Sequence, residues 1–334
     1  KTKIHKFLKK KLQDQKINRI YKKFEKSLST SENFAVAVSG GPDSLALAFL
    51  AKIYSIKHKL SPKFFIVDHK LRKESTIEAK RIKKVLNQSL INSQILTWRG
   101  KKPSKNIQSE ARNKRYKLML SKCDKYNINT ILLGHHQDDL FENFFIRILR
   151  GSGLKGLISL DKKTKIDNKY LLRPLLDQKK EDLIFISNKV FNFYVQDPSN
   201  NDDKYQRIRI RRLITNLQKD GLDKKKFYKT ILNLKSSNAV INFYVDENLK
   251  RNTSYLKEMN KLILNENFFQ QSYEVIFRSF SDVLKLIGEK HYPVRGKKID
   301  KVIKSIQFNK SFKATLGGCI IEKVNQTIII TKES

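Results

Sequence analysis

The chain has 334 residues, of which 39% are hydrophobic, and its formal net charge is +38 at pH 7. This length suffices for two domains with a substantial core, and the apolar content argues against a disordered chain. No apolar run approaches the roughly 20 residues of a transmembrane helix. The lysine-rich segment 1–11 lacks the apolar stretch of a signal peptide and predicts a basic N-terminal helix, so no membrane partner is expected.

The composition also indicates a partner and a compartment. The charge favours a polyanion such as nucleic acid, although the abundance of Lys, Asn and Ile is typical of an AT-rich genome and accounts for part of it. Cys123 and Cys319 lie far apart in the sequence and form no CxxC motif. This spacing argues against a zinc site and against a disulfide framework. Reduced cysteines lead us to expect a cytoplasmic protein.

Apolar runs alternate with helical patterns through the first half of the chain. Strands are predicted at 34–38, 64–67, 93–97 and 130–133, and helices at 45–56, 75–90, 107–126 and 138–149. This alternation predicts an α/β fold with a doubly wound, mostly parallel sheet that helices cover on both faces. Ligands of such sheets bind at the carboxyl ends of the strands, which is where Ser39, His69 and His135 are expected.

The turn after the first strand has the composition of a phosphate-binding loop. It consists of Ser39, Gly40, Gly41, Pro42, Asp43 and Ser44. Backbone N–H groups and a helix N-terminus form an anion site there, and glycine lets the backbone approach a phosphate. The serine hydroxyls add donors, and Asp43 supplies a carboxylate suited to phosphate-bound Mg²⁺. The loop has no lysine, which excludes the ordinary G-x-x-x-x-G-K-[ST] pattern. The alternative is a simple tight turn between strand and helix.

The helix that follows the fourth predicted strand carries two carboxylates near its start. Asp139 and Glu142 are three residues apart and share a face, where they suit a cationic substrate or a metal ion. His135 and His136 occupy the preceding turn, where a phosphate or its leaving pyrophosphate is expected. The alternative is structural, with Asp138 or Asp139 capping the first helical turn.

Three basic segments are candidate contacts for phosphate or RNA. Arg112 and Arg115 share one helical face, and arginine offers a planar fork for phosphate oxygens, although a solvated face explains the same spacing. Arg150 lies at a glycine-rich helix exit. A rigid turn at 197–202 precedes a basic strip, which suits RNA phosphates or, alternatively, a solvated helix start. The strip contains Arg207, Arg209, Arg211 and Arg212.

The sequence changes character beyond residue 160. A polar loop or hairpin is predicted at 161–170. A Lys/Asn-rich and mostly helical stretch follows at 213–265, with a linker near 236–238. The tail combines helices, predicted at 282–289 and up to residue 306, with short strands at 311–331.

These patterns predict two domains. The first covers residues 1–215 and contains the parallel sheet and the basic N-terminal helix. The second covers residues 216–334, in which a helical connector leads to a small α+β module from about residue 273.

In their chain order, the motifs resemble those of the tRNA(Ile)-lysidine synthetase family, a group of PP-loop ATP pyrophosphatases. The matching segments are SGGPDS at 39–44, VDHKLRKES at 67–75, NIQSEARNKRY at 106–116, GHHQDDLFENFFIRILRGSGLKGL at 134–157, LLRPLL at 171–176 and QDPSNNDDKYQRIRIRR at 196–212. HYPVRGKK at 291–298 and TLGGCIIE at 315–322 resemble the C-terminal module of the family. The resemblance implies an adenine nucleotide α-hydrolase-like first domain and a tRNA-binding second region.

The resemblance also implies a two-step reaction. ATP adenylates the C2 carbonyl of the wobble cytidine in a tRNA(Ile) with the anticodon CAU, and pyrophosphate leaves. The ε-amine of free L-lysine then displaces AMP, and lysidine forms. A homodimer is compatible with this family.

Site residues carry over from the family to the matching positions. The loop at 39–44 would bind the phosphates of ATP, and Asp43 would bind Mg²⁺. Arg112 would neutralise charge at the α-phosphate, with His135 assisting nearby. Asp139 and Glu142 would bind the ammonium group of the substrate lysine and favour its neutral amine. The proposed tRNA contacts are Arg150, Arg207, Arg209, Arg211 and Arg212.

Two other functions fit parts of the sequence. A tRNA thiolase of the same loop family needs reactive or cluster-binding cysteines, for which Cys123 and Cys319 are poorly placed. A non-catalytic RNA-binding protein with a relict nucleotide loop has no need of the intact Asp43, Asp139 and Glu142. Release of pyrophosphate from ATP distinguishes the enzymes from the binding protein.

Overall fold

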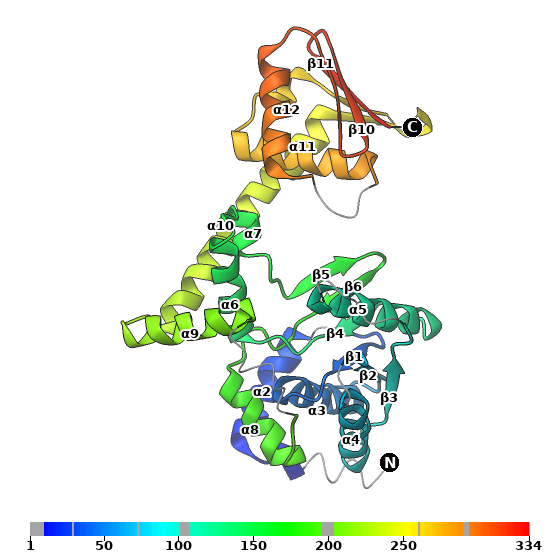
Figure 1. Ribbon diagram of the computed structural model, residues 1–334, viewed down its shortest axis with the longest axis vertical. Helices are drawn as coiled ribbons and strands as arrows, with labels where there is room; N and C mark the ends of the chain where they lie inside the picture. The colour runs from blue at the N-terminus through cyan, green and yellow to red at the C-terminus, as the bar shows by residue number, and fades with distance from the viewer. Residues whose placement is uncertain are drawn as a thin grey trace. The chain divides into compact units, whose positions relative to one another are not determined.

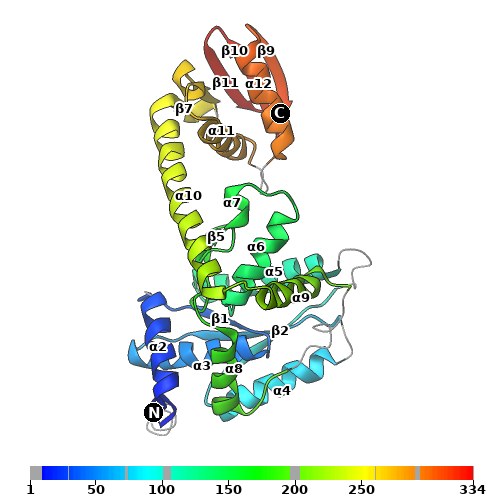
Figure 2. The same ribbon diagram turned by 90° about the vertical axis from the view of Figure 1, so that its left-hand side faces the viewer.

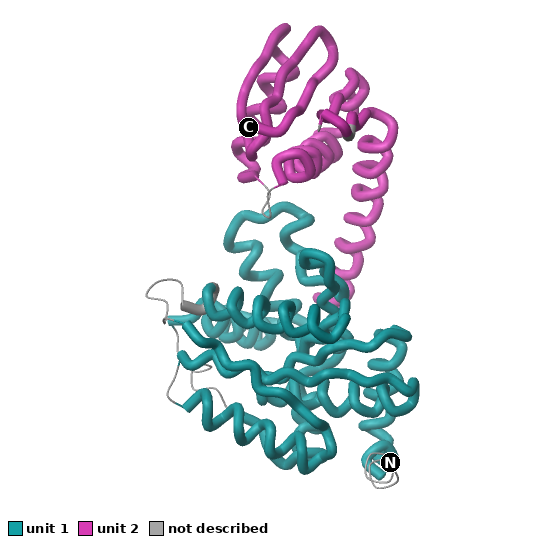
Figure 3. The backbone as a smooth tube through the Cα atoms, turned by 90° about the vertical axis from the view of Figure 1, so that its right-hand side faces the viewer, with its two compact units in different colours: residues 1–224 teal, residues 225–334 magenta. Residues whose placement is uncertain are grey.

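A computed structural model describes residues 10–28, 30–71, 74–100, 107–195, 204–259, 261–289 and 294–333. Most of the predicted basic N-terminal helix and all of the turn at 197–202 lie outside these residues. The chain forms two compact units, residues 1–224 and 225–334 (Figure 3). The boundary expected after residue 215 falls within helix α9 (Gln206–Lys219).

The first unit contains a six-stranded sheet with the strand order β3-β2-β1-β4-β6-β5. Its strands are β1 (Ala35–Val38), β2 (Lys63–Asp68), β3 (Ser93–Thr97), β4 (Thr130–Leu132), β5 (Lys163–Ile166) and β6 (Lys169–Leu172). Neighbouring strands pair in parallel except β5, which forms an antiparallel hairpin with β6. The predicted α/β fold with a doubly wound, mostly parallel sheet is confirmed.

Helices cover both faces of this sheet. Those of the first unit are α2 (Gln15–Ser27), α3 (Pro42–Lys57), α4 (Ser75–Gln88), α5 (Ile107–Lys125), α6 (Gln137–Ile148), α7 (Leu154–Leu157), α8 (Lys180–Phe191) and α9. Side chains alternate between the faces along each strand. Val36 and Phe64 pack with α2, α3, α4 and α8, whereas Ala35 and Phe65 pack with α5. Figures 1 and 2 show α5 on the opposite side of the sheet from α3 and α4.

Helix α3 is the central helix of this unit. Its residues Leu45–Ala51 are all fully buried, because the helix lies between the sheet and the outer helices α2 and α8. A helix that is apolar on all sides is typical of such a position. In the part of the chain that the structure describes, no helix combines the length and the apolarity needed to cross a membrane.

A carboxylate on α2 joins this helix to α3. Glu25 accepts hydrogen bonds from Lys57 Nζ (2.9 Å) and Tyr21 Oη (3.0 Å), and lies 3.1 Å from His58 Nε2. Burial alone would raise the pKa of Glu25, but these donors lower it below its ordinary value. The carboxylate therefore stabilises the fold above the pKa of the unfolded chain, and this contribution is lost as the pH falls through the lower folded pKa.

Replacing Glu25 should consequently weaken the protein only at higher pH. We expect Glu25→Gln to lower the free energy of unfolding by about 1 kcal/mol at pH 7 and by much less below about pH 4. Urea unfolding at both pH values measures the difference. The control is Glu32→Gln, at an exposed position of the same unit. An equal loss at both pH values would contradict the assigned role.

One long helix, α10 (Lys224–Asn252), starts at the last residue of the first unit and forms the beginning of the second. The linker predicted near 236–238 is wrong, because α10 passes through it without interruption. Serine and asparagine lower helix propensity by only about 0.5 kcal/mol each, which a tertiary contact can offset. The buried Arg278 of α11 (Tyr273–Ile287) supplies this contact by donating to Asn238 Oδ1 (2.7 Å) and Asn242 Oδ1 (3.1 Å).

An antiparallel sheet with the order β7-β8-β11-β10-β9 completes this unit. Its strands are β7 (Thr253–Leu256), β8 (Lys261–Leu264), β9 (Phe312–Leu316), β10 (Cys319–Val324) and β11 (Thr327–Lys332). Strands β7 and β8 correct the expectation of mostly helical structure up to residue 265. Leu262 and Leu264 alternate with less buried residues and pack with α11 and α12 (Gly296–Phe308) in the core. The α+β module thus begins at Thr253 and not near residue 273.

Candidate active site

The loop at residues 39–44 connects β1 to α3 and is ordered by one hydroxyl group. Ser44 Oγ accepts hydrogen bonds from the backbone N–H groups of Ser39 (3.1 Å) and Gly40 (3.0 Å). Pro42 occupies the first position of α3. A backbone N–H group at this position has no acceptor within the helix, so proline, which lacks it, is well suited there. The loop is thus preorganised and leads directly into the N-terminus of a long buried helix. This arrangement favours the binding of an anion.

Two glycines allow this loop to lie close to its neighbours. Gly40 has a φ of +89°, and a Cβ atom there would lie 2.3 Å from Ile82 Cδ1. Gly134 follows β4, and its Cβ would lie 3.2 Å from backbone atoms of Asp43 and Ser44. Only glycine therefore permits this approach of β4 to the first turn of α3.

Asp43 is the loop residue with an unsatisfied buried atom. Its Oδ2 lies 3.6 Å from His136 Nε2, whereas its buried Oδ1 has no hydrogen-bond partner within the described residues. A buried carboxylate oxygen of this kind suits a cation. In the described ranges, no group of three or more His, Cys, Asp or Glu side chains is arranged to hold a metal. A cation at Asp43 would therefore need further oxygen ligands from a bound phosphate, which is the usual mode for Mg²⁺.

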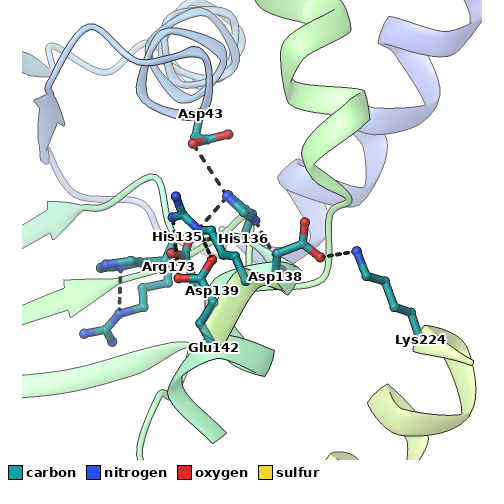
Figure 4. Close-up of polar contacts among 9 residues, drawn as sticks. Asp43, His135, His136, Asp138, Asp139, Glu142, Arg173 and Lys224 are labelled. Atoms are coloured by element: carbon teal, nitrogen blue, oxygen red, sulfur yellow. Dashed lines mark hydrogen bonds and ion pairs between the residues drawn. The ribbon is translucent and has the colours of Figure 1, made fainter. Parts of the chain in front are cut away.

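His136 and Asp139 cap helix α6 reciprocally. His136 Nδ1 accepts the backbone N–H of Asp138 (3.2 Å), and Asp139 Oδ2 accepts the backbone N–H of His136 (3.0 Å). The structural alternative for Asp139 is therefore correct, but the same side chain also lines the cavity. Asp138 is paired with Lys224, whose Nζ lies 2.9 Å from Oδ1 (Figure 4).

The charges around His136 and Asp139 stabilise one another. Burial would lower the pKa of His136, but the carboxylates of Asp43 and Asp139 raise it above its ordinary value. Burial would likewise raise the pKa of Asp139, but His136, His135 and the N-cap hydrogen bond lower it. Asp139 is therefore ionised at neutral pH.

Glu142 lies one turn further along α6 and is only 2% exposed. Arg211 of α9 approaches both of its carboxylate oxygens, with Nε 2.5 Å from Oε1 and Nη2 3.5 Å from Oε2. Burial raises the pKa of Glu142, and the ion pair with Arg211 offsets only part of this effect. Asp139 and Glu142 thus share one helix face with pKa values shifted in opposite directions.

The basic strip on α9 has two faces. Arg207 and Arg211 are four residues apart and both line the cavity, together with Arg112 and Arg115 of α5. Arg207, Arg209 and Arg212 are exposed, whereas Arg211 is half-buried. The helical spacing of four residues could have identified this division from the sequence, and we reassign Arg211 from the predicted RNA surface to the cavity.

Arg150 lies apart from this set. It is exposed and donates from Nη2 to Gln206 Oε1 at 3.2 Å. It therefore stays a candidate for an RNA contact and not for cavity chemistry.

Arg173 is a site residue that the sequence reasoning missed. It follows β6 and donates from Nε to His135 Nδ1 at 3.2 Å (Figure 4). Burial lowers the pKa of His135 to about 4, and the nearby guanidinium groups of Arg173 and Arg112 act in the same direction. The LLRPLL motif contains Arg173, but nothing in its local spacing indicates a contact 38 residues away.

One cavity of about 440 Å³ lies at the carboxyl ends of β1, β2 and β4. Of the groups above it is lined by the loop at 39–44, His135, His136, Asp139 and the arginines Arg112, Arg115, Arg207 and Arg211, whereas Glu142 and Arg173 are not among its lining residues. Its volume is that of a typical small-molecule site. Besides the groups above, His69 and Lys180 contribute to its lining. The cavity therefore combines an anion-binding loop, several arginines and the carboxylates of Asp43, Glu78 and Asp139, a set able to bind a polyphosphate and a cationic amine together.

Comparison with known proteins supports this interpretation. Residues 10–218 match the PP-loop domain family. The chain is 35% identical over 311 residues to the tRNA(Ile)-lysidine synthase of Orientia tsutsugamushi (strain Boryong), which covers 90% of this chain and 69% of the relative. It is 32% identical over 308 residues to the tRNA(Ile)-lysidine synthase of Wolbachia pipientis wMel, which covers 90% of this chain and 70% of the relative.

A solved structure shares the fold. The U34-tRNA thiolase NcsA from Methanococcus maripaludis, with its 4Fe-4S cluster, aligns with a TM-score of 0.56 and 16% sequence identity. The alignment covers 66% of this chain and 78% of that chain. At this sequence identity the likeness supports the fold alone.

Proposed function

Because this chain belongs to the tRNA(Ile)-lysidine synthase family of PP-loop enzymes and is thus an ATP-dependent ligase that modifies tRNA, we propose that it forms lysidine. It would join free L-lysine to C2 of the wobble cytidine in a tRNA(Ile) with the anticodon CAU. The observation that carries this proposal is a cavity that is lined by both the phosphate-binding loop and Asp139 of α6, with the buried Glu142 one helical turn further along the same helix.

The first step would form an adenylated cytidine. Oxygen O2 of the base attacks the α-phosphorus of ATP, a new P–O bond forms, and pyrophosphate leaves. The loop at 39–44 would bind the phosphates, and Arg112 would stabilise the charge that develops at the α-phosphate. Asp43 would hold Mg²⁺ through Oδ1, and the ion, when bound, would neutralise phosphate charge.

The second step would use the carboxylates of α6. The ε-amine of lysine attacks C2, the C–O bond to AMP breaks, and AMP leaves. Asp139 is ionised and would attract the ammonium group, whereas the raised pKa of Glu142 suits it to take up the proton that the amine must lose. Arg211 would have to loosen its contact with Glu142 as the lysine binds.

The remaining basic residues would contact the tRNA. The exposed arginines suit phosphate contacts, which add affinity without base specificity: Arg150, Arg207, Arg209 and Arg212. The second unit, residues 225–334, would supply further tRNA contacts.

The function is tested by incubating the full chain with labelled L-lysine, ATP and a tRNA(Ile) transcript with the anticodon CAU. We expect lysine incorporation that requires ATP and releases one AMP and one pyrophosphate per lysine. A methionine tRNA with the same anticodon is the substrate control. Pyrophosphate release without lysine incorporation would contradict the proposal and indicate another nucleophile.

The burial of both cysteines argues against the alternative function of a tRNA thiolase. Cys123 is buried in the first unit, where burial raises the pKa of its thiol to about 11, so the thiolate needed for sulfur chemistry is scarce. Cys319 is buried in the core of the second unit. A binding protein without catalysis is disfavoured by the buried Oδ1 of Asp43 and by the carboxylates placed beside the loop.

A further inference from the structure

Arg173 is a buried arginine whose guanidinium group donates a hydrogen bond to the ring of His135. It is 5% exposed, and its Nη1 donates to the carbonyl of Asp161 (2.7 Å) and to Thr164 Oγ1 (2.8 Å). These two contacts fix the guanidinium plane, and Nε then donates to His135 Nδ1 (3.2 Å). The three acceptors are all uncharged.

Burial of the charged Arg173 side chain among uncharged acceptors lowers the stability of the folded state. A buried cation is usually paired with a carboxylate, because burial without a counter-charge costs several kcal/mol. Burial lowers the pKa of the Arg173 guanidinium and outweighs the negative charges of Asp161 and Asp139, which favour its charged form. Arginine nevertheless remains protonated at neutral pH. The guanidinium of Arg173 is thus a permanently charged hydrogen-bond donor to Nδ1 of His135.

We propose that Arg173 is a positioning residue that holds His135 as a neutral imidazole with its proton on Nε2, so that His135 acts as a hydrogen-bond donor and not as a general base. The reason is geometric. The lone pair of Nδ1 accepts the N–H of Arg173, so Nδ1 cannot carry a proton, and the single proton of the neutral ring must reside on Nε2.

The groups that face His135 favour the same state. Arg173, Arg112 and Arg207 oppose a positive charge on the ring, and Asp139 is the acid that favours one. Burial and the three guanidinium groups outweigh Asp139, so the pKa of His135 falls to about 4. His136, which is adjacent in sequence, faces the carboxylates of Asp43 and Asp139 instead, and its pKa is raised. Neighbouring histidines in opposite environments are suited to different roles.

This inference rests on the proposed function for its chemical meaning. A neutral ring that donates from Nε2 can hydrogen-bond to a phosphate oxygen or to a base oxygen in the cavity without adding a proton to it. It would stabilise charge that grows during adenylation, as a neutral donor in an electrostatic role.

The test is a long-range ¹H–¹⁵N NMR spectrum of the full chain with ¹⁵N-labelled histidine, with His135→Gln used to assign the signals. We expect the wild-type ring to show an unprotonated Nδ1 and a protonated Nε2, unchanged between pH 8 and pH 5.5. In Arg173→Met both tautomers should be populated, and the ring should become protonated within this range. Arg173→Gln retains a neutral donor and should keep the Nε2 tautomer while the ring titrates at higher pH than in the wild type.

Activity provides the second readout. Arg173→Met should reduce the maximal rate of tRNA-dependent pyrophosphate release about 10- to 100-fold, with partial rescue by Arg173→Gln and little change in KM for ATP. Thr164→Val, which removes one anchor of the guanidinium, should give a smaller effect in the same direction. Arg19→Met, at an exposed position of α2, is the control for loss of an arginine.

A protonated Nδ1 in the wild type, or an unchanged ring state in both Arg173 variants, would overturn the inference. Failure of the proposed function is distinguishable from this. A chain that forms no lysidine, but whose His135 tautomer still depends on Arg173, would contradict the function and support the positioning role.

Discussion

Asp139→Asn should separate the two half-reactions by leaving pyrophosphate release nearly intact while reducing lysine incorporation about 100-fold or more. Asparagine keeps an oxygen that can accept the backbone N–H of His136, which Asp139 Oδ2 accepts at 3.0 Å, so the cap of α6 is preserved. The substitution removes the negative charge that attracts the ammonium group. A charge-assisted contact of this kind is about twice as strong as a neutral one.

The two half-reactions are measured on the same samples, with labelled ATP for pyrophosphate release and labelled lysine for transfer. Asp138→Asn is the matched control, because Asp138 is adjacent on α6 and is paired with Lys224 at 2.9 Å. The control should transfer lysine within a few-fold of the wild type. Parallel loss of both half-reactions in Asp139→Asn would contradict the assigned division of roles and indicate that its charge serves the whole cavity.

Gly40→Ala should strongly impair ATP turnover, with pyrophosphate release reduced by about 100-fold or more. Two effects combine at this position. The φ of +89° is one that side chains rarely adopt, and the added Cβ would lie 2.3 Å from Ile82 Cδ1 and 3.1 Å from Val195 Cγ2. Relief of the contact would shift the loop whose N–H groups the Ser44 hydroxyl orders. A displacement of about 1 Å costs roughly 100-fold in rate.

Gly221→Ala is the control for backbone strain alone. Gly221 has a φ of +103°, and nothing lies within 4 Å of the Cβ position there. This variant should lose about 1 kcal/mol of stability while retaining its rate of pyrophosphate release. Isothermal titration with a non-hydrolysable ATP analogue reports the binding part of the Gly40→Ala effect. Equal activities of the two alanine variants would show that the close approach of Ile82 to the loop is unimportant for catalysis.

Local patterns predicted the first unit well. The first four of the five parallel strands are short apolar runs followed by glycine or histidine turns, and their signals depend on residues close in sequence. The same holds for the loop at 39–44, whose role follows from its place between a strand and a buried helix. These features required no knowledge of tertiary contacts.

Features that depend on distant partners were not predictable. The local sequence at 236–238 is typical of a linker, and the contact of Arg278 with Asn238 that accompanies the helix there cannot be inferred from it. Strand β8 is likewise identified only by its pairing with β11. Arg173 reaches His135 across 38 residues, and Arg211 reaches Glu142 across 69 residues. Each is a side-chain contact between elements whose adjacency only the folded chain establishes.

Lysidine formation is tested most directly by mass spectrometry of the nucleosides of the CAU-anticodon tRNA(Ile) after incubation with the chain, ATP and L-lysine. We expect the wobble cytidine to be replaced by a nucleoside heavier by one lysine less one water, and we expect this product to be absent when ATP is omitted. An unmodified cytidine after ATP has been consumed, or a sulfur-containing nucleoside, would contradict this expectation.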